Sequence, residues 1–168
     1  MKWFLDLLSS TLGRKVLVAL TGIFLILFLV AHLAGNLQLL KDDGGRAFNI
    51  YAEFMGTNPI IQTISRVNFA LILVHIIWTI LLSRRNRAAR GKVGYAIVNK
   101  SAIWSSRNMG ILGTIILVFL VIHLRHFYAV SHFGPITFQT YDGREFKDLY
   151  TVVADWFSKD WYVGLYVA

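Results

Sequence analysis

Three long segments of this sequence contain no charged residue, and they restrict what the chain can fold into. Residues 16–40 form an uncharged run of 25 residues, and residues 67–83 and 108–124 form two further runs of 17 residues each. A helix that crosses a bilayer needs about 20 mostly apolar residues, and it satisfies its backbone hydrogen bonds internally. The composition agrees, because 56% of the residues are hydrophobic and only 15% are charged. The sequence therefore predicts an all-α transmembrane helical bundle.

The flanking residues give approximate limits for the membrane spans. Charges and turn residues place three complete spans at about 15–40, 60–83 and 107–130, with Pro59 marking the start of the second. A fourth begins near residue 161, and we expect it to continue beyond Ala168 because a span does not end after eight residues. A cleaved signal peptide is the competing interpretation of the first run, but the apolar part of a signal is only about 7–15 residues long. We expect residues 1–168 to form a single integral-membrane domain.

The loops between the spans differ strongly in charge. Residues 1–15 contain three Lys/Arg and one acid, and residues 84–107 contain seven Lys/Arg and no acid. Residues 41–66 contain three Lys/Arg and three acids, and residues 125–160 contain four Lys/Arg and five acids. Cytoplasmic loops are enriched in Lys and Arg, so the N-terminus and loop 84–107 are predicted to be cytoplasmic. The basic loop is a candidate docking surface, although contact with anionic lipid would also explain it.

A short hairpin is predicted on the opposite side of the membrane. The segment "TFQTYDGREF" contains Asp142 and Gly143 at its centre, and an Asp-Gly pair favours a tight two-residue turn.

Three of the five histidines, His32, His75 and His123, lie inside the uncharged runs. An ionisable group within a bilayer is costly unless it faces the protein interior and finds a partner, so it suggests a functional site. The alternative is a neutral histidine that hydrogen-bonds across a helix interface.

The depth of each histidine distinguishes the three. With a helix rise of about 1.5 Å per residue, His32 and His123 lie about 25 and 24 Å from the cytoplasmic edge of their spans, and His75 lies about 14 Å from that edge. A haem with two axial histidines needs ligands from facing helices at one depth. A neutral imidazole also brings no net charge into the membrane. The sequence thus predicts that His32 and His123 share one haem and that His75 belongs to a second layer.

A repeat accompanies these histidines. The segments "TGIFLILFLVAHL" and "LGTIILVFLVIHL" match at several positions, and Gly22 and Gly113 each precede their histidine by ten residues. Ser65 precedes His75 by the same ten residues. Small residues at these positions would let a flat cofactor approach the backbone, although they would also let helices pack closely.

Two further residues are candidates near the outer end of the third span. His126, three residues after His123, could compete as a ligand, but its extra rise of about 4.5 Å breaks the match in depth with His32. Arg125 could meet a haem propionate, or it could simply extend its guanidinium to the membrane surface.

The chain resembles the di-haem cytochrome b membrane-anchor subunit of succinate dehydrogenases and fumarate reductases. The resemblance rests on the two repeated histidine segments and on "RAFNIYAEFMGTNP" and "FALILVHII". The resemblance implies five helices and two b-type haems stacked across the membrane. It makes His32 and His123 the ligands of the distal haem, and His75 one ligand of the proximal haem. The partner of His75 would lie in the next helix, within about eight residues after Ala168.

The same resemblance implies a role in a succinate:quinone oxidoreductase complex. Electrons would pass between an iron–sulfur subunit on the cytoplasmic side and a membrane quinone, for which we expect menaquinone. Succinate or fumarate would react on a separate flavoprotein subunit, so this chain would contribute electron transfer to the respiratory chain and the tricarboxylic acid cycle but no succinate site. In some family members an acidic residue near the second span serves the quinone. Asn49 is the best match and Glu53 lies out of register, so the quinone site stays open.

The resemblance also gives expectations about location and assembly. The chain would lie in a bacterial cytoplasmic (inner) membrane, in contact with lipid, within a complex that could itself form an oligomer, and no nucleic acid partner is expected. The absence of cysteine excludes iron–sulfur clusters and covalently attached haem within this chain. Two other functions are the alternatives: a cytochrome b subunit of another membrane dehydrogenase, and a transport or structural membrane protein whose histidines pack or relay protons.

Overall fold

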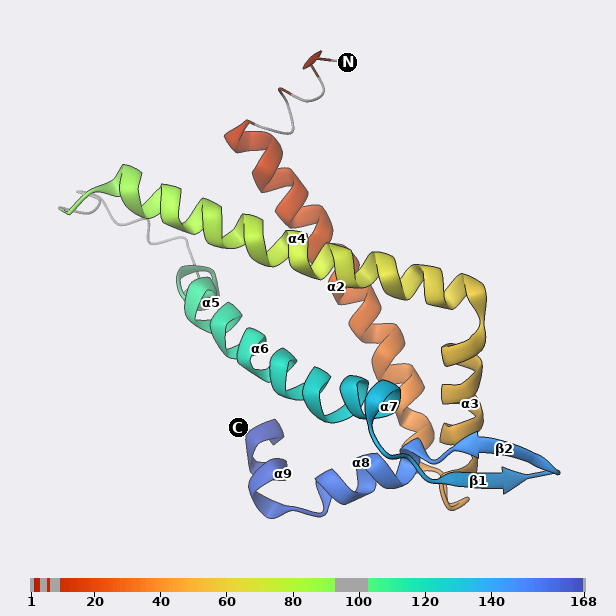
Figure 1. Cartoon of the computed structure of the whole chain (residues 1–168). Helices are drawn as coiled ribbons and strands as arrows, with labels where there is room; N and C mark the ends of the chain where they lie inside the picture. Colours follow the sequence, from red (N-terminus) through yellow and green to blue (C-terminus); the bar gives the residue numbers. More distant parts are fainter. Residues whose placement is uncertain (1, 4–5, 7–9, 93–102, 168) are drawn as a thin grey trace. The chain divides into compact units, whose positions relative to one another are not determined.

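The computed structural model describes residues 2–3, 6, 10–92 and 103–167, and most of these residues are helical (Figure 1). Three helical segments are long and apolar enough to cross a membrane: Thr11–Leu40, Pro59–Arg90 and Met109–Phe133. The prediction of three such helices is therefore confirmed. Part of the basic loop 84–107 lies outside the described residues.

The first and third of these segments consist of more than one element. The first combines α2 (Thr11–Asn36) with the 3₁₀ turn η1 (Leu37–Leu40), and the second is α4 (Pro59–Arg90) alone. The third begins as α6 (Met109–His123), passes through the π-helical turn η2 (Leu124–Tyr128) and ends as α7 (Ala129–Phe133). The shorter elements are α3 (Arg46–Thr57), α5 (Trp104–Arg107), β1 (Phe138–Tyr141), β2 (Arg144–Lys147), α8 (Leu149–Phe157) and α9 (Asp160–Val167).

The apolar side chains of the three long helices are mostly exposed. Leu27, Ile64 and Ile116 are 64%, 53% and 64% exposed, respectively. In a soluble protein so much exposed apolar surface would cause association, whereas in a bilayer it faces lipid at no cost. The exposure therefore agrees with a membrane protein.

The start of α4 follows from its sequence. Asn58 precedes the helix, and its side-chain oxygen accepts hydrogen bonds from the backbone amides of Ile60 at 3.0 Å and Ile61 at 3.2 Å. Pro59 occupies the first helical position, where its missing N–H costs nothing and its fixed φ angle suits the helix. The prediction that Pro59 begins the second long helix is confirmed.

The predicted hairpin is also confirmed. Strands β1 and β2 pair antiparallel with Tyr141 opposite Arg144, and the loop between them is Asp142 and Gly143. Both loop residues have positive φ angles, 51° and 75°. Paired positive φ angles are what the two-residue turns favoured by twisted strands require.

The chain divides into two compact units. One contains Met1–Ala31 and Thr63–Leu112, and the other contains His32–Gln62 and Gly113–Ala168. We call them the first and the second unit. The proposal that residues 1–168 form one domain stays a prediction.

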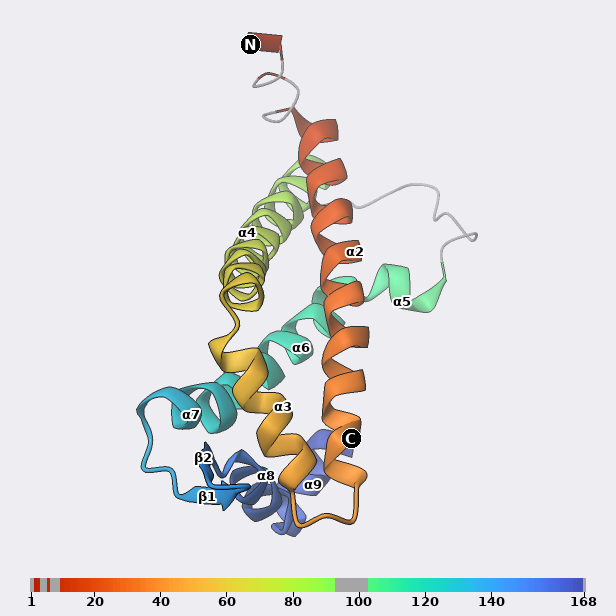
Figure 2. The same cartoon turned by 90° about the vertical axis from the view of Figure 1, so that its right-hand side faces the viewer.

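Two glycines allow α3 to pack within the second unit. Figure 2 shows α3 running back beside the last turns of α2, where a Cβ on Gly35 would lie only 2.5 Å from the Tyr51 hydroxyl. Gly45, with a φ of 86°, lies directly against the Tyr150 side chain from α8. A larger residue at Gly45 would overlap the Cβ and ring of Tyr150, and one at Gly35 would displace the Tyr51 ring.

Candidate functional site

His32 and His123 come together in the second unit, although 90 residues separate them in the sequence. His32 lies near the end of α2, and His123 is the last residue of α6. Their ring centroids are 5.7 Å apart, and their planes are nearly perpendicular, at 80°. Two predicted ligands from two membrane-length helices are thus neighbours.

The spacing of these two rings fits a pair of axial ligands. With metal–nitrogen distances of about 2 Å, two imidazoles on opposite sides of one metal would have their centroids about 6 Å apart. A haem iron takes one or two axial ligands from the protein, so a histidine pair is sufficient. Among the residues that the structure describes, no group of three or more His, Asp or Glu side chains could hold a bare metal ion.

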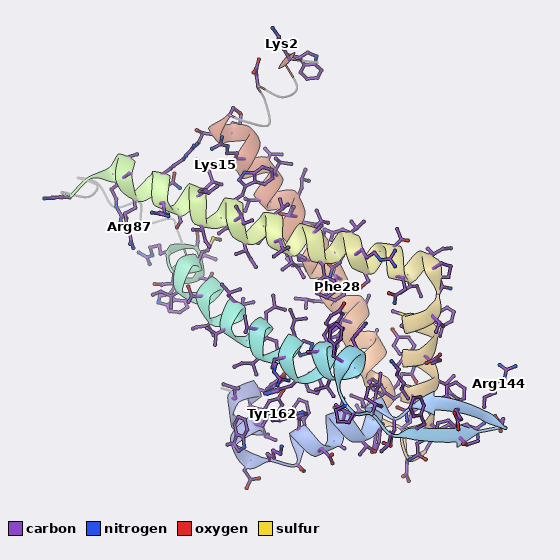
Figure 3. All side chains as sticks on the ribbon, viewed as in Figure 1. Lys2, Lys15, Phe28, Arg87, Arg144 and Tyr162 are labelled. Carbon is purple, nitrogen blue, oxygen red and sulfur yellow. The ribbon has the colours of Figure 1, made fainter. Side chains whose placement is uncertain are left out.

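Tyrosines from α9 extend the polar contacts of His123. The Tyr166 hydroxyl lies 3.4 Å from His123 Nδ1, and it accepts a hydrogen bond of 2.7 Å from the Tyr162 hydroxyl. Figure 3 labels Tyr162 on α9, and this side chain is completely buried. A partner on the second ring nitrogen is typical of metal-binding histidines because it orients the ring. Sequence reasoning missed both tyrosines, which the four-residue spacing in "WYVGLYVA" could have placed on one helix face.

His126 has different neighbours from His123. Its ring stacks on Trp156 at 3.7 Å, and its Nδ1 lies 3.4 Å from the Tyr162 hydroxyl. Turn η2, which begins directly after His123, inserts an extra residue into the helix and changes the direction of the residues that follow. The geometry therefore favours His123 as the partner of His32, and the choice of ligand stays a prediction.

His75 lies in the first unit, half-buried on α4. Its Nδ1 is 2.9 Å from the hydroxyl of Thr21 on α2. Gly22 is adjacent, and a Cβ there would lie 3.4 Å from His75 Cε1. The predicted cofactor residue Gly22 therefore lies beside the predicted ligand His75, and its role stays a prediction.

The other three predicted cofactor residues are Gly113, Ser65 and Arg125. A Cβ on Gly113 would meet no atom of the described residues within 4 Å. Ser65 is half-buried on α4, and Arg125 is exposed within η2. Their roles stay predictions.

Asn49 is a structural residue in this fold. Its side chain is 1% exposed, and its amide nitrogen donates to the Tyr141 hydroxyl at 3.2 Å and to Asp148 Oδ1 at 3.1 Å. Its amide oxygen accepts from the backbone N–H of Tyr150 at 2.9 Å. All the polar atoms of this side chain therefore take part in holding α3 against the hairpin and α8.

Asp148, which sequence reasoning did not select, completes this network. Its carboxylate caps α8 by accepting from the backbone N–H of Thr151 at 3.2 Å, and it also accepts from the Thr151 hydroxyl at 2.7 Å and from Gln139 Nε2 at 3.2 Å. Burial alone would raise the pKa of the Asp148 carboxyl, but the hydrogen bonds from Thr151, Gln139 and Asn49 together hold this pKa below its usual value. The ionised form is therefore the one that the fold stabilises.

Asp148 should make the fold sensitive to acid. Because its pKa is lower in the folded protein, its contribution to the free energy of unfolding is complete above the unfolded value of 3.8 and is lost as the pH falls through the folded value. We expect Asp148→Asn to destabilise the detergent-solubilised protein at neutral pH. The difference from wild type should shrink as the pH falls below 3.8. Thermal unfolding of both proteins above and below pH 3.8 measures this difference in stability. A difference that stays constant with pH would contradict a lowered pKa of Asp148 in the folded protein.

Comparisons with protein-family models, with curated proteins and with solved structures find no match to this chain.

Proposed function

We propose that this protein is a haem-b-binding membrane anchor that passes electrons between an iron–sulfur subunit and membrane quinone, within a succinate:quinone oxidoreductase complex. The observation that carries the proposal is the 5.7 Å approach of the His32 and His123 rings. Both residues come from helices that are long and apolar enough to cross a membrane. The similarity of the two histidine segments to those of the di-haem cytochrome b family supports the same function.

The proposed ligands suit their surroundings chemically. A neutral imidazole offers a lone pair to iron without bringing a net charge into a medium of low dielectric constant. Bound haem would supply a centre that gains and loses one electron within the membrane. Phe119, which stacks on His123 at 5.6 Å, and Tyr166 would restrict the rotation of that ring and keep its free nitrogen directed toward the metal.

The cytoplasmic side is proposed to dock the iron–sulfur and flavoprotein subunits. The last turns of α4 carry four exposed arginines, Arg84, Arg85, Arg87 and Arg90, of which Figure 3 labels Arg87. The positive-inside rule assigns this end to the cytoplasm, and hence the N-terminus as well. Residues 93–102 of the proposed docking loop lie outside the described residues. The membrane is proposed to be the bacterial cytoplasmic membrane, and the quinone menaquinone.

The proposal is tested by the absorption spectrum of the purified complex. We expect the reduced-minus-oxidised difference spectrum to contain b-type haem bands, and we expect flavin and iron–sulfur subunits to copurify with the chain. A folded, full-length protein without b-type bands would exclude every haem function and favour a transport or structural role. Haem bands together with the subunits of a hydrogenase or a formate dehydrogenase would assign the chain to a different complex.

A further inference from the structure

We propose that Thr21 fixes the tautomer of His75, so that Nδ1 carries the proton and Nε2 keeps the lone pair that binds iron. This inference rests on the proposed function, because it concerns how His75 acts as a haem ligand. It begins from the contact of 2.9 Å between Thr21 Oγ1 and His75 Nδ1. Either atom could in principle donate in this contact, so the direction depends on the other bonds of the threonine.

The threonine hydroxyl has one proton, and an acceptor for that proton is already present on its own helix. Thr21 Oγ1 donates to the backbone carbonyl of Leu17 at 2.9 Å, with the carbonyl of Val18 at 3.0 Å. Such bonds to the preceding helical turn are the usual choice of a threonine within a helix. If the proton pointed to His75 instead, Oγ1 would face two carbonyl oxygens at hydrogen-bond distance without a proton between them. The hydroxyl oxygen therefore accepts, and Nδ1–H of His75 donates.

The surroundings hold this arrangement in place. Thr21 is only 7% exposed, so water does not readily reach its hydroxyl. The adjacent Gly22 has no side chain, which lets the imidazole edge approach α2. In histidine ligands the hydrogen bond at one nitrogen determines which nitrogen binds the metal. The contact thus leaves Nε2 unprotonated.

The hydrogen bond should also affect the iron. Donation from Nδ1–H to an oxygen makes the imidazole a more basic ligand, and a more basic ligand favours oxidised over reduced iron. Thr21 is therefore a positioning residue whose hydroxyl lowers the midpoint potential of the haem that His75 binds.

The test is a redox titration of the intact complex carrying substitutions at Thr21. Thr21→Val keeps the shape of the side chain and removes the hydroxyl, whereas Thr21→Ser keeps the hydroxyl. We expect Thr21→Val to raise the midpoint potential of one haem and leave the other unchanged, and Thr21→Ser to remain near wild type. Loss of one haem in Thr21→Val but not in Thr21→Ser would give the same support, because Thr21→Ser keeps the hydroxyl that Thr21→Val removes. Thr79→Val, at an exposed threonine one turn from His75 on the same helix, is the matched control and should not change either potential.

The outcomes separate this inference from the proposed function. A wild-type complex without b-type bands would overturn the proposed function itself. If the wild type binds haem and Thr21→Val keeps the full haem content with both potentials unchanged, the role of Thr21 is wrong and the function stands. Equal changes in Thr21→Val and Thr21→Ser would likewise overturn the inference, because they would arise from packing rather than from the hydroxyl.

Discussion

Replacing either His32 or His123 by alanine should remove one b-type haem from the complex and leave a second one in place. Each substitution removes one of the two proposed axial ligands, whose rings lie 5.7 Å apart, and a side chain of alanine cannot coordinate iron. The second proposed haem would depend on His75, which lies in the other compact unit. Haem content per chain and a redox titration followed by absorption measure the result, and the same potential should disappear in both variants.

His126→Ala is the matched control for this experiment. His126 lies three residues from His123, and its ring stacks on Trp156. We expect this variant to keep both haems. If His126→Ala lost a haem and His123→Ala did not, the ligand assignment would be wrong. If His32→Ala and His123→Ala each removed a different haem, the pairing would be wrong.

Replacing Asn49 by leucine should strongly destabilise the second unit. The new side chain is similar in size, but it removes the donor to the buried Asp148 carboxylate and the acceptor of the Tyr150 N–H. A lost hydrogen bond to a charged group and an unsatisfied buried amide together cost about 2–4 kcal/mol. Equilibrium unfolding in mixed detergent and SDS micelles measures the change in the free energy of unfolding.

Arg46→Met provides the comparison on the same helix. Arg46 begins α3 and forms an ion pair with Asp142, in which the two side chains are 48% and 76% exposed. Exposed ion pairs contribute about 0–1 kcal/mol, so this variant should unfold close to wild type. Similar losses in Asn49→Leu and Arg46→Met would contradict a special role for the buried amide. A change below 1 kcal/mol in Asn49→Leu would show that the network stabilises little.

Local sequence signals were sufficient for several parts of this fold. The three uncharged runs predicted the long helices, because a membrane-length apolar segment has few alternatives to a helix. The start of α4 depends on Asn58 and Pro59, through hydrogen bonds within a few residues. The hairpin turn depends on Asp142 and Gly143, through their positive φ angles. The depth calculation for His32 and His123 also selected two residues that the structure brings together, because helix rise is nearly constant.

Interactions between distant residues could not be predicted in the same way. Asn49 and Asp148 are 99 residues apart, and neither has a local pattern that identifies its partner. The spacing of Tyr162 and Tyr166 places them on one helix face, but it does not indicate that this face meets His123 and His126. Turn η2 has no signal in its sequence, and it explains why His126 does not share the surroundings of His123 despite a spacing of three residues.

Turn η2 also affects how this chain should be compared with others. A π turn has one residue more than the corresponding α turn, so it is the three-dimensional equivalent of a one-residue insertion directly after His123. A homologue with an uninterrupted α-helix here would align with His123 before the turn and would be offset by one position after it. Arg125 and His126 would then be matched to the wrong residues by an alignment without a gap. Transfer of residue roles past His123 therefore requires an alignment that allows a gap at residues 124–128.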